Sequence, residues 1–257
     1  MKIAGIGTTL VFALAFTVSV LGQEATRPVA GAGAAPTKSL VEKKSGTGPA
    51  FGRPRALPPE AFTTPTNYIL VVNQNGVVDD QWLEDECTLM GKQLRVSVRA
   101  EKATDEIGSD PRTFVAAIRA KHEDKAKIVI VLSDEKDITP ILTAPYEYWV
   151  VMDANWVKAG GGDEATQNLR MGKRMFQALG HCIGAGHRQE REAVMRYTPT
   201  PIALDDCLSH GFHPLNSNVF SIVQQAIGLE GIRLRPRQEL IDMGLLKPRV
   251  PKEAKSE

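Results

Sequence analysis

The sequence predicts an α/β fold, with a mixed, mostly parallel twisted sheet, flanking helices, one long helix and a small helical C-terminal subdomain. Short apolar runs alternate with segments of helical periodicity in the first half of the chain, which is typical of strand–helix–strand crossover units. A glycine run at 160–162 ends that half, and a long helical pattern follows it. The 257 residues, 42% of them hydrophobic, suffice for one substantial core.

The first predicted strand, at 68–72, is a short continuous apolar run rich in β-branched residues, which is typical of a buried strand. Asp79 or Asp80 can cap the helix that follows, which is expected to run to about Gly91. Apolar and polar residues then alternate over 94–98, and this alternation predicts the second strand.

Three more elements complete this half of the chain. Asp110-Pro111 opens a helix, because proline is favoured in the first helical turn. The run at 127–132 is the clearest buried strand of the sequence, and 148–151 is another. The resulting order of strand, helix, strand, helix and strand predicts largely parallel pairing.

The second half of the folded region is predicted to be helical. Asp163 and Thr166 are candidate caps for a long helix over 164–183. Another helix is expected over 216–227, with its apolar residues on one face. Together these elements place the folded domain at 67–230.

The two ends of the chain are predicted to lie outside this domain. Residues 1–22 look like a secretory signal, with a basic start at Lys2 and an apolar run over 10–20. An uncleaved membrane anchor is the rival interpretation, because the apolar stretch approaches the length that spans a bilayer. We expect export to the periplasm or the extracellular space, and no membrane span once the signal is cleaved. Residues 23–66 are predicted to be a disordered linker and 231–257 a basic tail.

Charge and cysteine content argue against two classes of protein, the nucleic-acid-binding proteins and the disulfide-rich scaffolds. Lys and Arg total 31 and Asp and Glu total 30, and cleavage after residue 22 would remove only Lys2, so the charge balance favours no nucleic-acid partner. Three cysteines are too few for a disulfide scaffold. Cys182 and Cys207 flank the loop of the candidate site, and they either pair or are buried free thiols.

The end of the long helix carries the candidate site. His181 and His187 flank a turn at Gly184. Position 177 lies one helical turn before His181 and shares its face. In a zinc hydrolase of the His-Glu-x-x-His type, the first two positions hold a zinc ligand and the general base. Here those positions are Gln177 and Ala178.

This spacing resembles the metzincin metallopeptidases, whose pattern is His-Glu-x-x-His-x-x-Gly-x-x-His with a later methionine turn. The pattern falls on Gln177, Ala178, His181, Gly184, His187 and Met195. The resemblance implies the scaffold of a zinc peptidase, with Met195 in a hydrophobic floor beneath the site. It also implies a sharp turn at Gly184 that returns the last ligand towards the metal. It covers residues 67–228 and is most specific around 177–195.

Within that family the chain is most similar to the archaemetzincins. These carry four cysteines for a second zinc, and the corresponding positions here are Arg188, Ala193, His213 and Asn216. The resemblance therefore implies no second structural zinc of that kind in this chain.

The first zinc site is degenerate as well. A catalytic zinc needs three protein ligands, a water and a neighbouring carboxylate that accepts the proton of that water. His181 and His187 are the predicted ligands, and Gln177 is a poor third one. Ala178 accepts no proton, so we predict a vestigial or weak zinc site without a catalytic residue. Candidates for further ligands are Asp205, Asp206, His210 and His213.

Three functions remain open at this point. The first is a catalytically inactive, exported metzincin-like protein that retains a cleft for a peptide or protein ligand. The second is a zinc-dependent metallopeptidase whose metal site is remodelled with residues outside the motif. The third is an extracytoplasmic structural domain. We favour the first, because Ala178 replaces the general base, whose loss costs roughly 10²–10⁴-fold in rate.

Overall fold

The computed structural model of the protein describes residues 57–135 and 140–247. The chain divides into two units, and all described residues belong to the second unit, Pro54–Glu257. The predicted signal segment at 1–22 lies outside the described residues, and so does the predicted linker as far as residue 56.

The centre of the fold is a five-stranded sheet in the order β2-β1-β3-β5-β4. Four strands pair in parallel, and β4 runs antiparallel to β5 at one edge. The strands are β1 (Tyr68–Gln74), β2 (Val98–Ala103), β3 (Ala126–Ser133), β4 (Ile141–Ala144) and β5 (Trp149–Asp153). The prediction of a mixed, mostly parallel sheet with flanking helices is confirmed.

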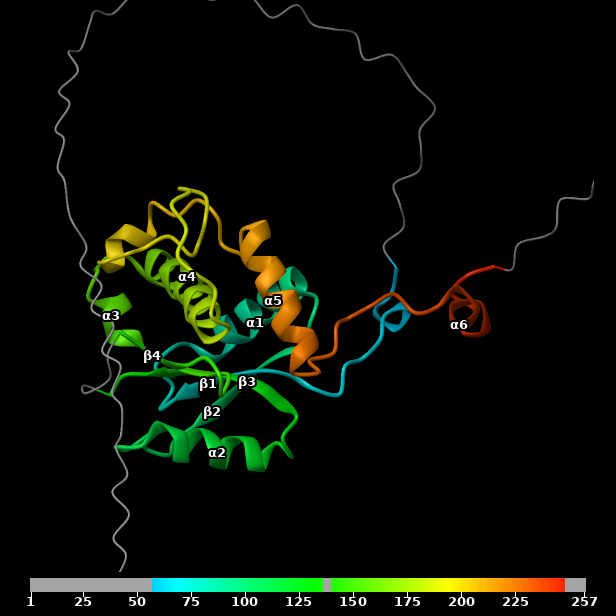
Figure 1. Ribbon diagram of the computed structural model, residues 1–257, viewed down its shortest axis with the longest axis horizontal. Helices are drawn as coiled ribbons and strands as arrows, with labels where there is room; N and C mark the ends of the chain where they lie inside the picture. Colours follow the sequence, from blue (N-terminus) through cyan, green and yellow to red (C-terminus); the bar gives the residue numbers. More distant parts are fainter. Residues whose placement is uncertain (1–56, 136–139, 248–257) are drawn as a thin grey trace, which may run out of the picture. The chain divides into compact units, whose positions relative to one another are not determined.

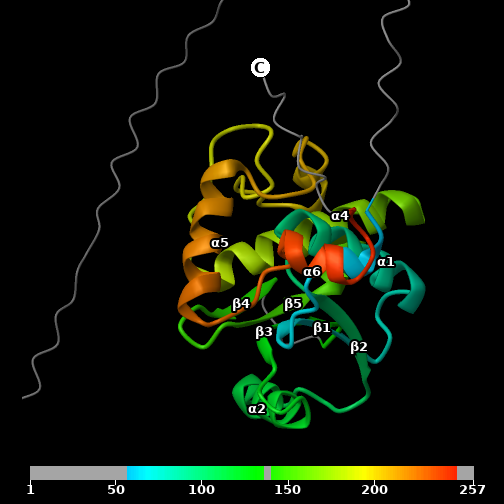
Figure 2. The same ribbon diagram turned by 90° about the vertical axis from the view of Figure 1, so that its right-hand side faces the viewer.

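Helices cover both faces of this sheet, with α2 on one face and α1, α4 and α5 on the other (Figures 1 and 2). The α-helices are α1 (Asp80–Leu94), α2 (Pro111–Lys121), α3 (Ala154–Lys158), α4 (Glu164–Cys182), α5 (Pro214–Ala226) and α6 (Arg237–Asp242). Two short 3₁₀ helices are η1 (Pro59–Ala61) and η2 (Pro201–Leu204). None of the helices in the described part of the chain is long and apolar enough to cross a membrane.

The continuous apolar runs of the central strands follow from burial on both sides. In β1, Ile69 and Val71 join the core beneath α1 and α4. Leu70 and Val72 point to the opposite side and join the core beneath α2. Because side chains alternate along a strand, a strand that is buried on both faces needs apolar residues at successive positions.

The second strand is not where the alternating pattern at 94–98 predicts it. Helix α1 continues to Leu94, which is buried, and Arg95 ends it in a left-handed conformation at φ 56°. Strand β2 begins only at Val98, which pairs with Ile69. The prediction was wrong because Leu94 belongs to the apolar face of α1, and the alternation that begins with it continues into the true strand through Val98 and Ala100, which pack against the core.

The ordered fold extends past the predicted domain limits at 67 and 230. Residue Thr63 donates its backbone N–H to Arg233 O at 2.8 Å, and Arg235 donates to Ala61 O at 2.9 Å. An antiparallel bridge joins Phe62 to Leu234. Two extended segments thus satisfy each other's backbone groups, which neither composition nor periodicity reveals. Residues 248–257 of the predicted tail lie outside the described residues.

Candidate functional site

The candidate site is built on α4, which is buried at nearly every position from 170 to 182. Of the two candidate caps, Asp163 is the one that caps the helix, because its side chain accepts a hydrogen bond from Thr166 N at 2.8 Å. Thr166 itself lies within the first helical turn. Met171, Met175 and Leu179 are buried in the core against the sheet. The residues of the candidate site therefore project from the flank of a helix that the core holds rigidly.

The helix ends as the sequence predicts, at a sharp turn. Gly184 has a left-handed backbone at φ 73°, which costs glycine nothing. Its N–H donates to His181 O at 3.1 Å, and the N–H of Ala185 donates to Gly180 O at 2.8 Å. These are the two bonds of a Schellman motif, and they turn the chain back towards the helix.

This turn brings the two predicted histidines together. The ring centroids of His181 and His187 are 4.9 Å apart with an interplanar angle of 71°. His181 is half-buried and His187 is exposed, and the Tyr197 ring lies 5.6 Å beyond His187. Burial, together with the smaller effects of the neighbouring His187 and Arg174, lowers the pKa of His181 to about 4. His181 is therefore neutral at physiological pH.

Gln177, the predicted weak ligand, has its amide engaged with protein groups. The side chain is 1% exposed, and its Nε2 donates to Val194 O at 2.8 Å and to Arg196 O at 3.1 Å. Its Oε1 accepts from Arg174 at 2.8 Å and from the Thr198 hydroxyl at 3.2 Å. The oxygen that would bind a metal thus already faces a guanidinium cation.

Ala178 and Met195 are both fully buried. Ala178 is fully buried in the core and brings no proton acceptor to the site. Met195 is also fully buried, and a methyl group on Gly180 would overlap its sulfur. Met195 therefore packs directly against the last turn of α4.

The candidates for additional ligands do not converge on the two histidines. Asp206 lies 3.8 Å from Arg191, in an exposed pair. His210 Nε2 lies 2.8 Å from Glu86 Oε1, and His213 caps α5. Asp205 is bound to Arg170 at the other end of α4. Among residues 57–135 and 140–247, no group of three or more His, Cys, Asp or Glu could hold a metal ion. The donors as arranged do not fit a catalytic zinc.

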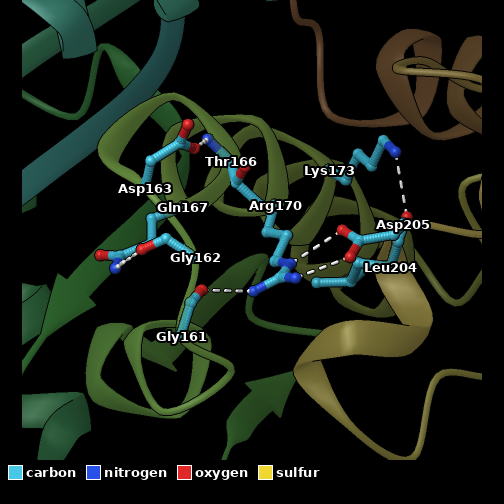
Figure 3. A network of polar contacts seen from close by, with 9 residues as sticks. All are labelled: Gly161, Gly162, Asp163, Thr166, Gln167, Arg170, Lys173, Leu204 and Asp205. Carbon is cyan, nitrogen blue, oxygen red and sulfur yellow. Dashed lines mark hydrogen bonds and ion pairs between the residues drawn. The ribbon is translucent and has the colours of Figure 1, made fainter.

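Buried cations of α4 are the feature that sequence reasoning missed. Arg170 donates to both carboxylate oxygens of Asp205 at 2.8 and 2.6 Å, and to Gly161 O at 2.7 Å (Figure 3). In the same view, Lys173 Nζ donates to Leu204 O at 2.9 Å. Arg174 stacks at 4.1 Å on the Trp156 ring, and burial lowers its pKa to about 10. The only signal in the sequence was three cations within five positions of a helix that is otherwise apolar on one side.

Two further features of the described residues are the cysteines at 182 and 207 and two surface hollows. Cys182 and Cys207 are both buried free thiols, and burial raises the pKa of Cys182 to about 12. One hollow of about 400 Å³ lies between the end of β2 and α2. Another, of about 530 Å³, lies between residues 63–65 and 224–233. Both hollows lie away from His181 and His187.

No protein-family model and no curated protein matches the chain. Solved structures that are similar to it include the following two. One is an archaemetzincin from Methanopyrus kandleri, at 15% identity and a TM-score of 0.49, over 62% of this chain and 96% of that chain. The other is a zinc-dependent peptidase from Methanocorpusculum labreanum, at 14% identity and a TM-score of 0.47, over 59% of this chain and 98% of that chain.

Proposed function

We propose that this protein is an exported, catalytically inactive metzincin-like protein that binds a peptide or protein without cleaving it. The observation that carries the proposal is that the side-chain amide of Gln177 is fully hydrogen-bonded to protein groups. Its partners are Val194, Arg196, Arg174 and Thr198. An amide used in this way cannot serve as the third ligand of a catalytic zinc unless the surrounding loop is taken apart.

Two further observations support inactivity. Ala178 stands at the position of the general base and is buried, so no carboxylate at that position reaches a metal-bound water. A remodelled zinc site would need new ligands, but Asp205, His210 and His213 are each engaged elsewhere. A remodelled metallopeptidase site therefore has no group of donors to support it among the described residues.

Binding is supported by the character of the exposed surface at the end of α4. Tyr197 is 66% exposed and its ring stands edge-on to His187. Aromatic side chains with a polar tip are enriched in recognition surfaces, because they combine apolar contact area with a hydrogen-bonding group. The imidazoles of His181 and His187 would add hydrogen-bonding groups to the same surface. The proposal of export depends on the signal-like residues 1–22.

The test of inactivity is metal content and cleavage measured on the same preparation. After dialysis we expect well under one zinc per chain, and no cleavage of a mixed peptide library in the presence of added zinc. Stoichiometric zinc and cleavage that a chelator abolishes would contradict the proposal. If His210→Ala or His213→Ala removed that zinc, the remodelled metallopeptidase would be the correct function.

The test of binding uses the same library without cleavage. Peptides retained by the purified protein should be lost by the variant Tyr197→Ser, while Tyr146→Ser should retain them. Tyr146 is a matched control because it is 95% exposed and distant in the sequence from the site. If both variants retain the same peptides as the unmodified protein, the surface beside His187 is not the binding surface. If no peptide is retained at all, the structural-domain alternative is favoured.

A further inference from the structure

The loop that returns beneath α4 is held from two sides at three successive carbonyl groups. Val194 O and Arg196 O accept from Gln177 Nε2 at 2.8 and 3.1 Å. Met195 O, between them, accepts from Arg188 N at 3.0 Å and lies 3.1 Å from His187 Nδ1. Residues 194–196 are thus hydrogen-bonded both to Gln177 of α4 and to the segment that carries Arg188.

We propose that Gln177 is a positioning residue that holds this loop, and through it His187, in place without a metal. We call Gln177 with its partners Arg174, Thr198, Val194 O and Arg196 O the Gln177 clamp. In a three-ligand metal site, the ion would tie the helix to the returning segment through shared coordination. In this chain the amide and its partners make that connection directly.

The chemistry of glutamine explains why this residue suits the role. A primary amide carries two N–H donors and an acceptor oxygen on one group, so it can donate to two carbonyls while it accepts from Arg174 and Thr198. Glutamate has no donor when ionised, and histidine has only one donor when neutral. A histidine at position 177, as in a zinc peptidase, would therefore leave at least one buried carbonyl unpaired.

The clamp and a metal also compete for the same oxygen. Arg174 is 7% exposed, stacks on Trp156 and donates to Gln177 Oε1 at 2.8 Å. A divalent cation on that oxygen would have to displace the guanidinium and would then stand beside its charge. Metal binding at this point would thus cost the loop its attachment.

The opening of the Gln177 clamp can be measured through cleavage of the peptide bond between Arg196 and Tyr197. The carbonyl of Arg196, which Gln177 holds at 3.1 Å, is the carbonyl that trypsin attacks when it cleaves between Arg196 and Tyr197. Cleavage there requires the clamp to open. Arg191 lies in the same loop with a side chain 67% exposed and does not contact Gln177, so cleavage after it is an internal reference.

The experiment compares initial tryptic rates at these two bonds in the full chain under native conditions with EDTA present. Losing the buried hydrogen bonds to Val194 O and Arg196 O should raise the population of the open loop about tenfold or more in Gln177→Leu. Gln177→Glu keeps the size and the acceptors but loses the donors, so it should also be cleaved about tenfold faster after Arg196. Thr198→Val removes one partner and should be cleaved a few-fold faster.

The control is Gln189→Leu, which makes the same replacement at an exposed glutamine of the same loop. It should leave both rates unchanged. A second readout is the NMR signal of the His187 ring, which should shift in Gln177→Glu and not in Gln189→Leu, because only the clamp is connected to His187 through Met195.

Three outcomes would overturn the proposal. The first is an Arg196 cleavage rate in Gln177→Glu equal to that of the unmodified chain, which would mean that donation to the carbonyls does not hold the loop. The second is a tenfold acceleration of the unmodified chain by EDTA, which would mean that a metal holds it. The third applies if Gln177→Leu does not fold: Thr198→Val then decides, and an unchanged rate in that variant is evidence against the clamp.

Discussion

The two ends of α4 are attached to the chain that follows it by different chemistry. Near the N-terminal end, Arg170 forms an ion pair with Asp205, whose carboxylate is 42% exposed (Figure 3). Near the C-terminal end, the attachment is the neutral amide of Gln177, which is 1% exposed. The difference follows from burial, because a charged pair at the surface keeps part of its hydration whereas a fully buried carboxylate would not.

This comparison also bears on Gln177, which the metzincin-like spacing predicts to be a weak zinc ligand. Its neutral, hydrogen-bonded amide lies at the fully buried end of the helix. The same position can hold a metal ligand or attach the loop directly, and Gln177 is suited to the second role.

The largest expected effect concerns the charged end. Asp205→Asn leaves the Arg170 guanidinium, 5% exposed, without a counter-charge. We expect the free energy of unfolding to fall by about 2–3 kcal/mol, somewhat less than for a fully buried pair because water reaches the carboxylate. Urea unfolding at pH 7 measures it. The neighbouring change Asp206→Asn removes an exposed carboxylate 3.8 Å from Arg191 and should cost less than about 0.5 kcal/mol. Equal losses of unfolding free energy in the two variants would mean that the Arg170–Asp205 pair contributes no more stability than an exposed ion pair.

The next largest effect is the pH dependence of stability that arises from His181, near the C-terminal end of α4. The pKa of His181 is lowered to about 4 in the folded protein, from an ordinary value of 6.5. The unfolded chain therefore binds more protons between those values, so stability falls as the pH drops from 6.5 to 4, by about 2 kcal/mol for this half-buried group. His181→Gln should flatten the pH dependence of unfolding in that window. Asp205 does not confuse this measurement, because its hydrogen bond to Arg170 lowers its pKa. Its contribution to stability is therefore lost only in the acidic range below about pH 4. An identical slope in His181→Gln would contradict the assignment.

The smallest effect tests the packing beneath the neutral end. A methyl group on Gly180 would overlap the buried Met195 side chain. Displacing a packed side chain costs about 1–3 kcal/mol, and the higher helix propensity of alanine returns about 1 kcal/mol, so Gly180→Ala should lose about 1 kcal/mol. Gly186→Ala is the control, since no atom lies within 4 Å of the added methyl group. Thermal unfolding of both variants distinguishes them, and a Gly180→Ala variant as stable as the unmodified chain would mean that Met195 does not pack there.

Much of the fold follows from local pattern. The apolar runs that became β1, β3 and β5 mark strands buried on both faces, and the cap at Asp163 and the turn at Gly184 mark the limits of α4. The edge strand β2 was misplaced because Leu94, the last residue of α1, continues the alternation of apolar and polar residues that leads into the strand. The pairing of residues 61–63 with 233–235 depends on backbone hydrogen bonds between distant segments, which leave no trace in composition.

The candidate site divides in the same way. The sequence by itself determined which chemical groups are present: two imidazoles around a glycine turn, a glutamine at position 177 and an alanine at position 178. Only the tertiary structure decided where the Gln177 amide points and what it binds. Its partners Val194 and Thr198 are 17 and 21 residues away, on a loop whose path depends on the Gly184 turn and on the packing of Met195. Spacing along a helix places a side chain on a face, but the orientation of a buried amide is set by the donors and acceptors that the rest of the fold brings to it.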